Sequence, residues 1–157
     1  MVGASDKAVT LTGSAQTTAF VLQPPSGPAR LAAEPQASRT YLSVENVTSE
    51  KSHATYDVYV NLPDHPDAAA YKEHHAGALP MFGVVQASTP SDRHPGDGLN
   101  FSLDITQLVN RLKARNAWDE KNIRVTFAPR GAGDKTPTAL PVRHQPIRVG
   151  RVSLYKS

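Results

Sequence analysis

Histidine side chains have the widest chemical range of any group in this sequence, because an imidazole can bind a metal or transfer a proton near neutral pH. Of the six histidines, His74 and His75 adjoin one another, and His65 and His94 lie in polar stretches that also carry aspartates. A metal site needs ligands that converge from fixed positions, as histidines one helical turn apart do. No pair here has that spacing, and adjacent histidines on a strand point to opposite faces. We therefore expect hydrogen-bonded or solvated histidines and no metal site.

Nucleophilic and phosphate-binding chemistry also lack their usual settings. The chain has no cysteine, which excludes a thiolate ligand, a disulfide and a cysteine nucleophile. No serine stands in a Gly-x-Ser-x-Gly elbow, and Gly96-Asp97-Gly98 lacks the preceding strand and following helix of a phosphate-cradling loop. The sequence predicts no catalytic residue, and a metal-dependent enzyme would rest on His74, His75 and His94 alone.

Three tyrosines suggest a different kind of site. Tyr41, Tyr59 and Tyr155 fall in segments with strand patterns and would form an aromatic binding platform, for example for a glycan, if they shared one outer sheet face. The alternative is that they form cross-strand pairs that stabilise the sheet. A free-standing module that binds a small ligand or glycan is therefore one functional hypothesis.

Composition narrows the remaining classes. The 157 residues suit one domain spanning 1–157, and the net charge of +3 comes from scattered basic residues, which argues against nucleic-acid binding. No apolar run approaches the ~20 residues of a membrane span, and the first residues lack the pattern of a secretory signal. We expect a soluble domain without a signal or transmembrane segment.

Alternating apolar and polar residues predict short strands. The two most regular segments are 40–47, with Leu42 and Val44 on one face, and 56–62, with its valines on one face. At the last strand the apolar positions change face at Gly150, which predicts a β-bulge. The remaining strands are predicted at 7–12 and 17–22, as a hairpin, and at 75–83, 99–103, 123–127 and 147–154.

One helix is predicted directly after the strand at 99–103. Asp104 has the N-cap residue type, with Gln107 at capping-box spacing. An apolar stripe follows at helical spacing and consists of Ile105, Leu108, Val109 and Leu112. Trp118 is placed to close the core behind this helix. Elsewhere, residues 68–70 are consistent with a single helical turn.

About eight short strands and one α-helix predict an all-β fold, namely an antiparallel, jelly-roll-like β-sandwich whose helix covers one open end. Long irregular loops rich in proline, glycine and small residues are expected at 23–38 and 131–146. Between the regular strands, the segment 75–83 is apolar and punctuated by glycine. It is consistent either with a core strand or with an apolar tip that is held out toward a partner.

Several segments, in order along the chain, resemble one family. They are the strand Tyr56-Asp57-Val58-Tyr59-Val60-Asn61, the pair Ala76-Gly77, the strand-to-helix segment 103–109, the strand Val125-Thr126-Phe127-Ala128-Pro129-Arg130 and the last strand, 149–154. Together they resemble the C-terminal domain of tyrosinases and polyphenol oxidases, the type-3 copper enzymes. The segment before residue 48 resembles the continuation found in bacterial members.

This resemblance implies a function. In the family, the β-sandwich packs over the entrance of a binuclear copper site in a separate catalytic domain, can offer an apolar side chain to that entrance, and so holds the enzyme latent. Help with folding or copper loading is a further family role. The chain would then be non-catalytic, its partner would be the catalytic domain of a tyrosinase-like enzyme, and copper would reside in that partner. The candidates for the plugging side chain are Leu79, Met81 and Phe82, each of which is equally consistent with core packing.

Overall fold

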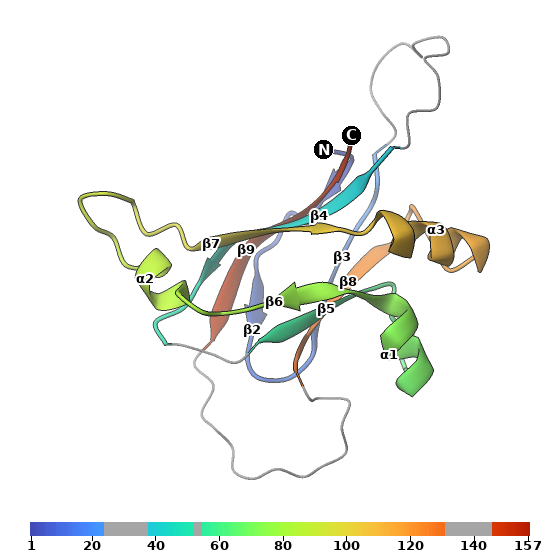
Figure 1. The fold of residues 1–157 in the computed structure, drawn as a ribbon, viewed down its shortest axis with the longest axis horizontal. Helices are drawn as coiled ribbons and strands as arrows, with labels where there is room; N and C mark the ends of the chain where they lie inside the picture. The colour runs from blue at the N-terminus through green and yellow to red at the C-terminus, as the bar shows by residue number, and fades with distance from the viewer. Residues whose placement is uncertain (24–37, 52–54, 131–145) are drawn as a thin grey trace.

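The computed structural model describes residues 1–23, 38–51, 55–130 and 146–157. Its strands form two antiparallel sheets that pack face to face (Figure 1). Sheet A has the order β1-β9-β4-β7, with β2 also paired to β9, and comprises β1 (Gly3–Ala4), β2 (Val9–Leu11), β4 (Thr40–Thr48), β7 (Leu99–Asp104) and β9 (Ile147–Lys156). Sheet B has the order β3-β8-β5-β6 and comprises β3 (Gln16–Phe20), β5 (Tyr56–Val60), β6 (His75–Leu79) and β8 (Ile123–Pro129). The antiparallel β-sandwich predicted from the sequence is confirmed.

The core lies between the sheets and is built from the inward positions of the central strands. Leu42 and Val44 of β4 are fully buried, as are Val58 and Val60 of β5, whereas Tyr41 is only half-buried. The alternation therefore identifies the inward residues of these two strands, although in β5 Tyr56 and Asp57 are buried as well. Trp118 packs against this core behind the last helix, as expected.

The short strands β2 and β3 do not form the predicted hairpin. β2 pairs with β9 in sheet A, and β3 pairs with β8 in sheet B, so the turn at Gly13 carries the chain from one sheet to the other. The Gly13 amide donates a hydrogen bond to the Tyr56 hydroxyl oxygen at 3.1 Å. Each short strand thus pairs with a longer strand distant in sequence, a choice that local turn residues cannot reveal.

The predicted change of face near Gly150 is present, but the register shift lies on a different strand. β4 and β9 stay in continuous register through Glu45 opposite Arg151 and Val47 opposite Val149. The register shift occurs between β4 and β7, from Val44 to Val47. A Cβ at position 150 would lie only 2.8 Å from the Cβ of Asn46, so glycine lets the two strands approach closely where both change face.

The described residues contain three helices rather than one: α1 (Ala68–His74), α2 (Val84–Ser88) and α3 (Thr106–Ala114). The single turn expected at 68–70 extends to two turns because Asp67 caps it, accepting a hydrogen bond from the Ala70 amide at 2.7 Å. α2 was missed because its adjacent valines have the residue type of a strand. The loops expected at 23–38 and 131–146 lie almost wholly outside the described residues.

α3 carries the predicted apolar stripe on its buried face, but its capping differs from the prediction by one residue. The helix begins at Thr106, and Ile105 holds the N-cap position. The Asp104 carboxylate accepts hydrogen bonds from the Thr106 amide at 3.0 Å and hydroxyl at 2.6 Å. Asp104 therefore still accepts a hydrogen bond from a free amide at the start of the helix. The hydrogen bonds from Thr106 lower the pKa of Asp104 below its usual value.

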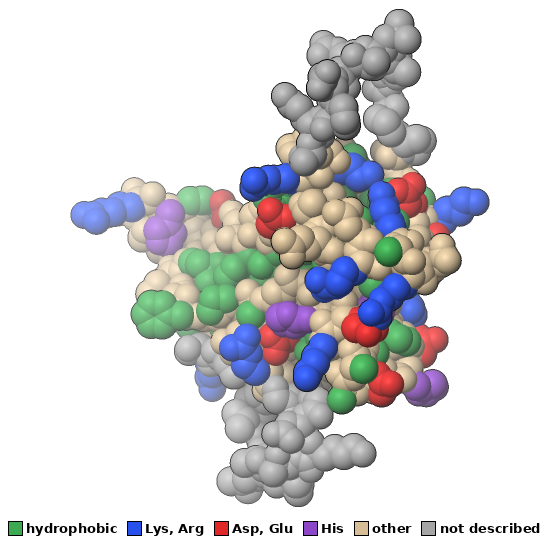
Figure 2. Space-filling view, turned by 45° about the vertical axis from the view of Figure 1, so that its right-hand side comes forward, with side chains coloured by type: hydrophobic (Ala, Val, Ile, Leu, Met, Phe, Trp, Pro, Cys, Tyr) green, Lys and Arg blue, Asp and Glu red, His purple; other side chains and the backbone are tan. Residues whose placement is uncertain are grey.

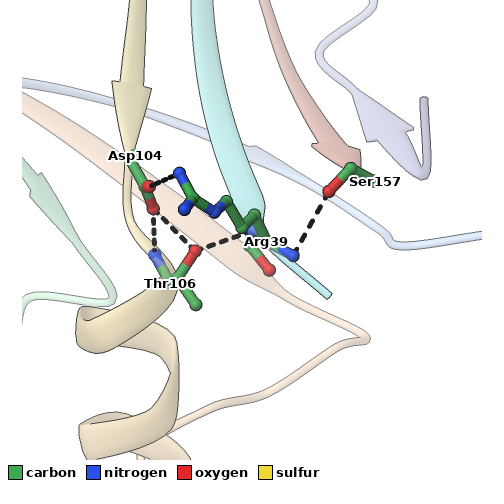
Figure 3. A network of polar contacts seen from close by, with 5 residues as sticks. Arg39, Asp104, Thr106 and Ser157 are labelled. Carbon is green, nitrogen blue, oxygen red and sulfur yellow. Dashed lines mark hydrogen bonds and ion pairs between the residues drawn. The ribbon is translucent and has the colours of Figure 1, made fainter. Parts of the chain in front are cut away.

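A small polar network ties this helix start to the ends of two sheet A strands (Figure 3). The Arg39 amide donates to Ser157 Oγ at 3.3 Å, and the Thr40 amide donates to Thr106 Oγ1 at 2.9 Å. Arg39 also pairs with Asp104 at 3.8 Å, with both side chains largely exposed. The network holds the start of α3 at one end of the sandwich. α2 lies at the opposite end (Figure 1).

Candidate functional site

The segment Leu79–Val84, here called the tip, follows β6 directly. Pro80 ends the strand because it has no amide hydrogen to donate. The Val84 amide then donates to the Met81 carbonyl oxygen at 3.2 Å, which closes a four-residue turn. Gly83 has φ 78° and ψ 1°, the conformation that the third residue of a type II turn requires and that glycine adopts without steric cost. The turn places Phe82 at its outermost position.

The side chains of the tip divide sharply between core and solvent. Leu79 and Val84 are fully buried, and Met81 is 1% exposed, whereas Phe82 is 93% exposed. Leu79 and Met81, two of the predicted plug candidates, are therefore core residues and are not available to a partner. Their spacing of two puts them on the same side of an extended segment, and the turn that follows leaves Phe82 in solvent. Phe82 is thus the single plug candidate that reaches solvent.

An apolar surface leads up to the tip along the open side of the sandwich. In the described part of the chain, β6 and β7 are edge strands of the two sheets, each paired on one side only, and they contact one another. Half-buried apolar side chains line this boundary, and Figure 2 shows hydrophobic side chains gathered in a band over this part of the surface. We call this surface the seam; it consists of Ala76, Val85, Leu99, Phe101 and Leu103.

Small residues on β6 let the seam close. A Cβ at Gly77 would lie 3.0 Å from Cδ2 of Leu103, so the absence of a side chain there makes room for Leu103 to lie across the boundary between the sheets. This gives a structural reason for the glycine of the Ala-Gly pair. A side chain at 77 would require the Leu103 side chain to shift.

β6 is held from its outer side by a polar cluster. The Asp57 carboxylate pairs with His75 Nε2 at 3.0 Å and accepts a hydrogen bond from the Arg130 guanidinium at 3.2 Å. Burial raises the pKa of Asp57, but the hydrogen bonds and charges of Arg130 and His75 together outweigh it and leave this pKa below its usual value. The Tyr59 ring packs edge-on against the rings of Tyr71 and His75. The cluster anchors the strand from which the tip extends.

The histidines singled out in the sequence do not converge. His74 is buried at the end of α1, with Nδ1 2.9 Å from the Val60 carbonyl oxygen, while His75 begins β6 and pairs with Asp57. His65 and His94 are exposed in separate loops. Among the residues that the structure describes, no group of three or more His, Cys, Asp or Glu side chains could hold a metal ion.

The three tyrosines do not share one face. Tyr41 and Tyr155 lie opposite one another on neighbouring strands of sheet A, but Tyr59 belongs to sheet B. The expectation of a three-tyrosine platform is therefore wrong, because the strand that carries Tyr59 lies in the other layer of the sandwich. The pair that remains is cross-strand, as the alternative interpretation of these residues required.

Gly83 is the residue of this site whose role sequence reasoning missed. A glycine three residues after a proline, next to an apolar run, is consistent with a turn. Its effect on Phe82 could not be inferred, because the segment was also compatible with a continuous strand. Separately, none of the helices in the described ranges is long and apolar enough to cross a membrane.

The fold and the tip together define a class: an antiparallel β-sandwich domain that presents an exposed aromatic side chain at the end of an apolar seam. The family model described as "Domain of unknown function (DUF7868)" matches residues 1–157, and the chain belongs to this family. Over 137 residues it is 36% identical to Tyrosinase HcTyr1 of Hahella sp. (strain CCB-MM4), a match that covers 87% of this chain and 27% of that protein.

Solved structures with the same fold include latent enzymes. The latent apple tyrosinase aligns over 97% of this chain and 28% of its own, with a TM-score of 0.51 and 20% sequence identity. Latent aurone synthase, a polyphenol oxidase from a natural source, aligns over 92% of this chain and 25% of its own, with a TM-score of 0.52 and 16% identity. The relation to tyrosinases and polyphenol oxidases inferred from the sequence is confirmed, and the chain spans about a quarter of the length of these relatives.

Proposed function

We propose that this chain is a non-catalytic shielding and assembly domain of a tyrosinase-like copper oxidase. It packs over the entrance of the binuclear copper site in the catalytic domain, and Phe82 occupies that entrance. One observation carries the proposal: Phe82 is 93% exposed although the residues on both sides of its turn are anchored in the core. The turn fixes the backbone position of Phe82 and points its side chain away from the core, as a plug requires.

The physical effect of such a plug is steric and apolar. A phenyl ring in the entrance displaces water and blocks an aromatic substrate from the same space, while burial of the ring favours the closed state by about 1.5–3 kcal/mol. The tip is short and tied at both ends, so little conformational entropy is lost when the ring is buried. Copper belongs to the partner in this proposal.

Diphenol oxidation by the copper-loaded remainder of the Hahella tyrosinase, measured with increasing amounts of this chain, tests the proposal. We expect the rate to fall to a low plateau at saturation. The Phe82→Ala variant should leave most of the activity at saturation, because the entrance stays open. Val21→Ala is the matched control, since Val21 is also an exposed large hydrophobic residue, 59% exposed, but lies outside the tip; it should inhibit like the unaltered chain.

Gly83→Ala provides a second variant that keeps the aromatic ring. Nothing lies within 4 Å of the position of its added Cβ, so any effect comes from the positive φ of the turn, which costs an L-residue about 1–2 kcal/mol. The tip should shift and inhibition weaken while Phe82 remains. If the unaltered chain binds the enzyme but leaves the rate unchanged, or if Phe82→Ala inhibits fully, Phe82 is not a plug.

A further inference from the structure

The side chain of Phe82 is too small to form a stable interface between two protein domains by itself. A phenylalanine side chain buries roughly 150–250 Å². A stable, specific interface buries about 800 Å² on each partner. Phe82 can therefore supply at most about a third of the contact area, and other residues must supply the remaining surface.

The seam has the chemistry and the position for that surface. Its residues are apolar yet only partly buried, and they come from β6, β7 and α2, the elements that lead into or out of the tip or pack beside it. β7 shows the pattern clearly, because Leu99, Phe101 and Leu103 are half-buried on one side while Asn100, Ser102 and Asp104 are exposed on the other. An apolar surface of this kind, continuous with an exposed aromatic ring, is typical of the centre of an interface.

We propose that the seam is the docking surface for the catalytic part of the parent enzyme, so that the seam provides affinity and Phe82 provides inhibition. The inference rests on the proposed function for the identity of the partner. Among the relatives, the matched region is 27% of the Hahella tyrosinase and the same fold is 28% of the latent apple tyrosinase chain, so in both it shares one polypeptide with a larger remainder. That remainder is the occupant to which we assign the seam.

The division of roles predicts two separable effects in one titration. Phe101→Asp places a charge in the middle of the docking surface, and burial of an unpaired charge should raise the Kd for the copper-loaded remainder of the Hahella tyrosinase about 100-fold or more. Once saturated, this variant should still inhibit fully, because its Phe82 is intact. Ser102→Asp is the matched control: it adds the same charge to the next residue of β7, on the exposed side, and should change the Kd less than about 3-fold.

Amide hydrogen exchange on the unaltered chain gives a measurement that needs no variant. Thermal unfolding first shows whether the Phe101→Asp variant is folded. If it is not folded, hydrogen exchange of the unaltered chain alone tests whether the seam is the docking surface. Binding should protect amides of β6 and β7, including those at their unpaired edges, and should leave β2 and β3 unchanged.

The outcomes separate this inference from the proposed function. Equal affinities of Phe101→Asp and Ser102→Asp, or protection confined to other strands, would overturn the seam as the docking surface and leave Phe82 as a plug. Weakened binding by Phe101→Asp together with an unchanged oxidation rate on saturation by the unaltered chain would support the seam and overturn the shielding role.

Discussion

The seam and the outer face of sheet A are built from some of the same strands. They differ in whether their side chains already have partners within the domain. On the outer face, one carboxylate oxygen of Glu45 accepts hydrogen bonds from the hydroxyls of Ser43 at 3.0 Å and Ser153 at 3.2 Å, and a longer one from Tyr155 at 3.5 Å. On the seam, apolar side chains remain partly open to solvent and end at an aromatic ring that is 93% exposed.

This difference indicates which side of the sandwich meets a partner. The polar groups around Glu45 on the outer face already have partners within the domain, so contact with another protein there would have to replace existing hydrogen bonds. The apolar groups of the seam gain from any contact that removes them from water. β7 contributes to both surfaces, because successive side chains of a strand point in opposite directions.

The largest expected effect on stability lies within the tip itself. Met81→Ala removes a side chain that is 1% exposed and leaves a cavity beneath the tip, which should lower the free energy of unfolding by about 2–5 kcal/mol. Phe82→Ala is the paired control and should change it by less than about 0.5 kcal/mol, since the ring lies in water. Urea unfolding of both variants measures the contrast. Equal losses would show that Phe82 is packed in the core and that the comparison with the outer face fails.

A smaller loss is expected on the outer face of sheet A. Glu45→Ala leaves the hydroxyl of Ser153, a fully buried residue, without its acceptor, and this should cost about 1–3 kcal/mol. Glu45→Gln keeps an acceptor oxygen and should cost less. The same unfolding measurement applies. An unchanged stability for Glu45→Ala would mean that the hydroxyls of this face are satisfied without the carboxylate.

The smallest effect concerns the cluster that anchors β6, and it depends on pH. The pKa of Asp57 is lower in the folded chain than its usual value, about 3.9 in unfolded chains. Its contribution to stability is therefore fully present above about pH 4 and is lost as the pH falls through the folded-state pKa. Unfolding curves of the unaltered chain and Asp57→Asn between pH 7 and pH 2.5 should converge toward low pH. A constant difference between the two would contradict the role of Arg130 and His75 in this cluster.

Much of the fold could be predicted because its strands follow the alternation of their own residues. The inward residues of the segments 40–47 and 56–62 are buried as predicted, and the stripe of α3 is buried as its spacing required. The pairing of β2 and β3 and the register shift on β4 depend on neighbours distant in sequence, whereas α2 was missed because its valines have the residue type of a strand. Local residue types do not encode which of two possible partners a short segment meets.

The sequence by itself determined that the segment 75–83 is apolar, that Pro80 and Gly83 interrupt it, and that it belongs to a family of tyrosinase-related domains. It could not choose among Leu79, Met81 and Phe82, because all three are apolar and any of them could fill a core. The tertiary structure made the choice. β6 pairs with β5 in a register that buries Leu79, and the core accepts Met81 and Val84, so the positive φ of Gly83 leaves Phe82 outside.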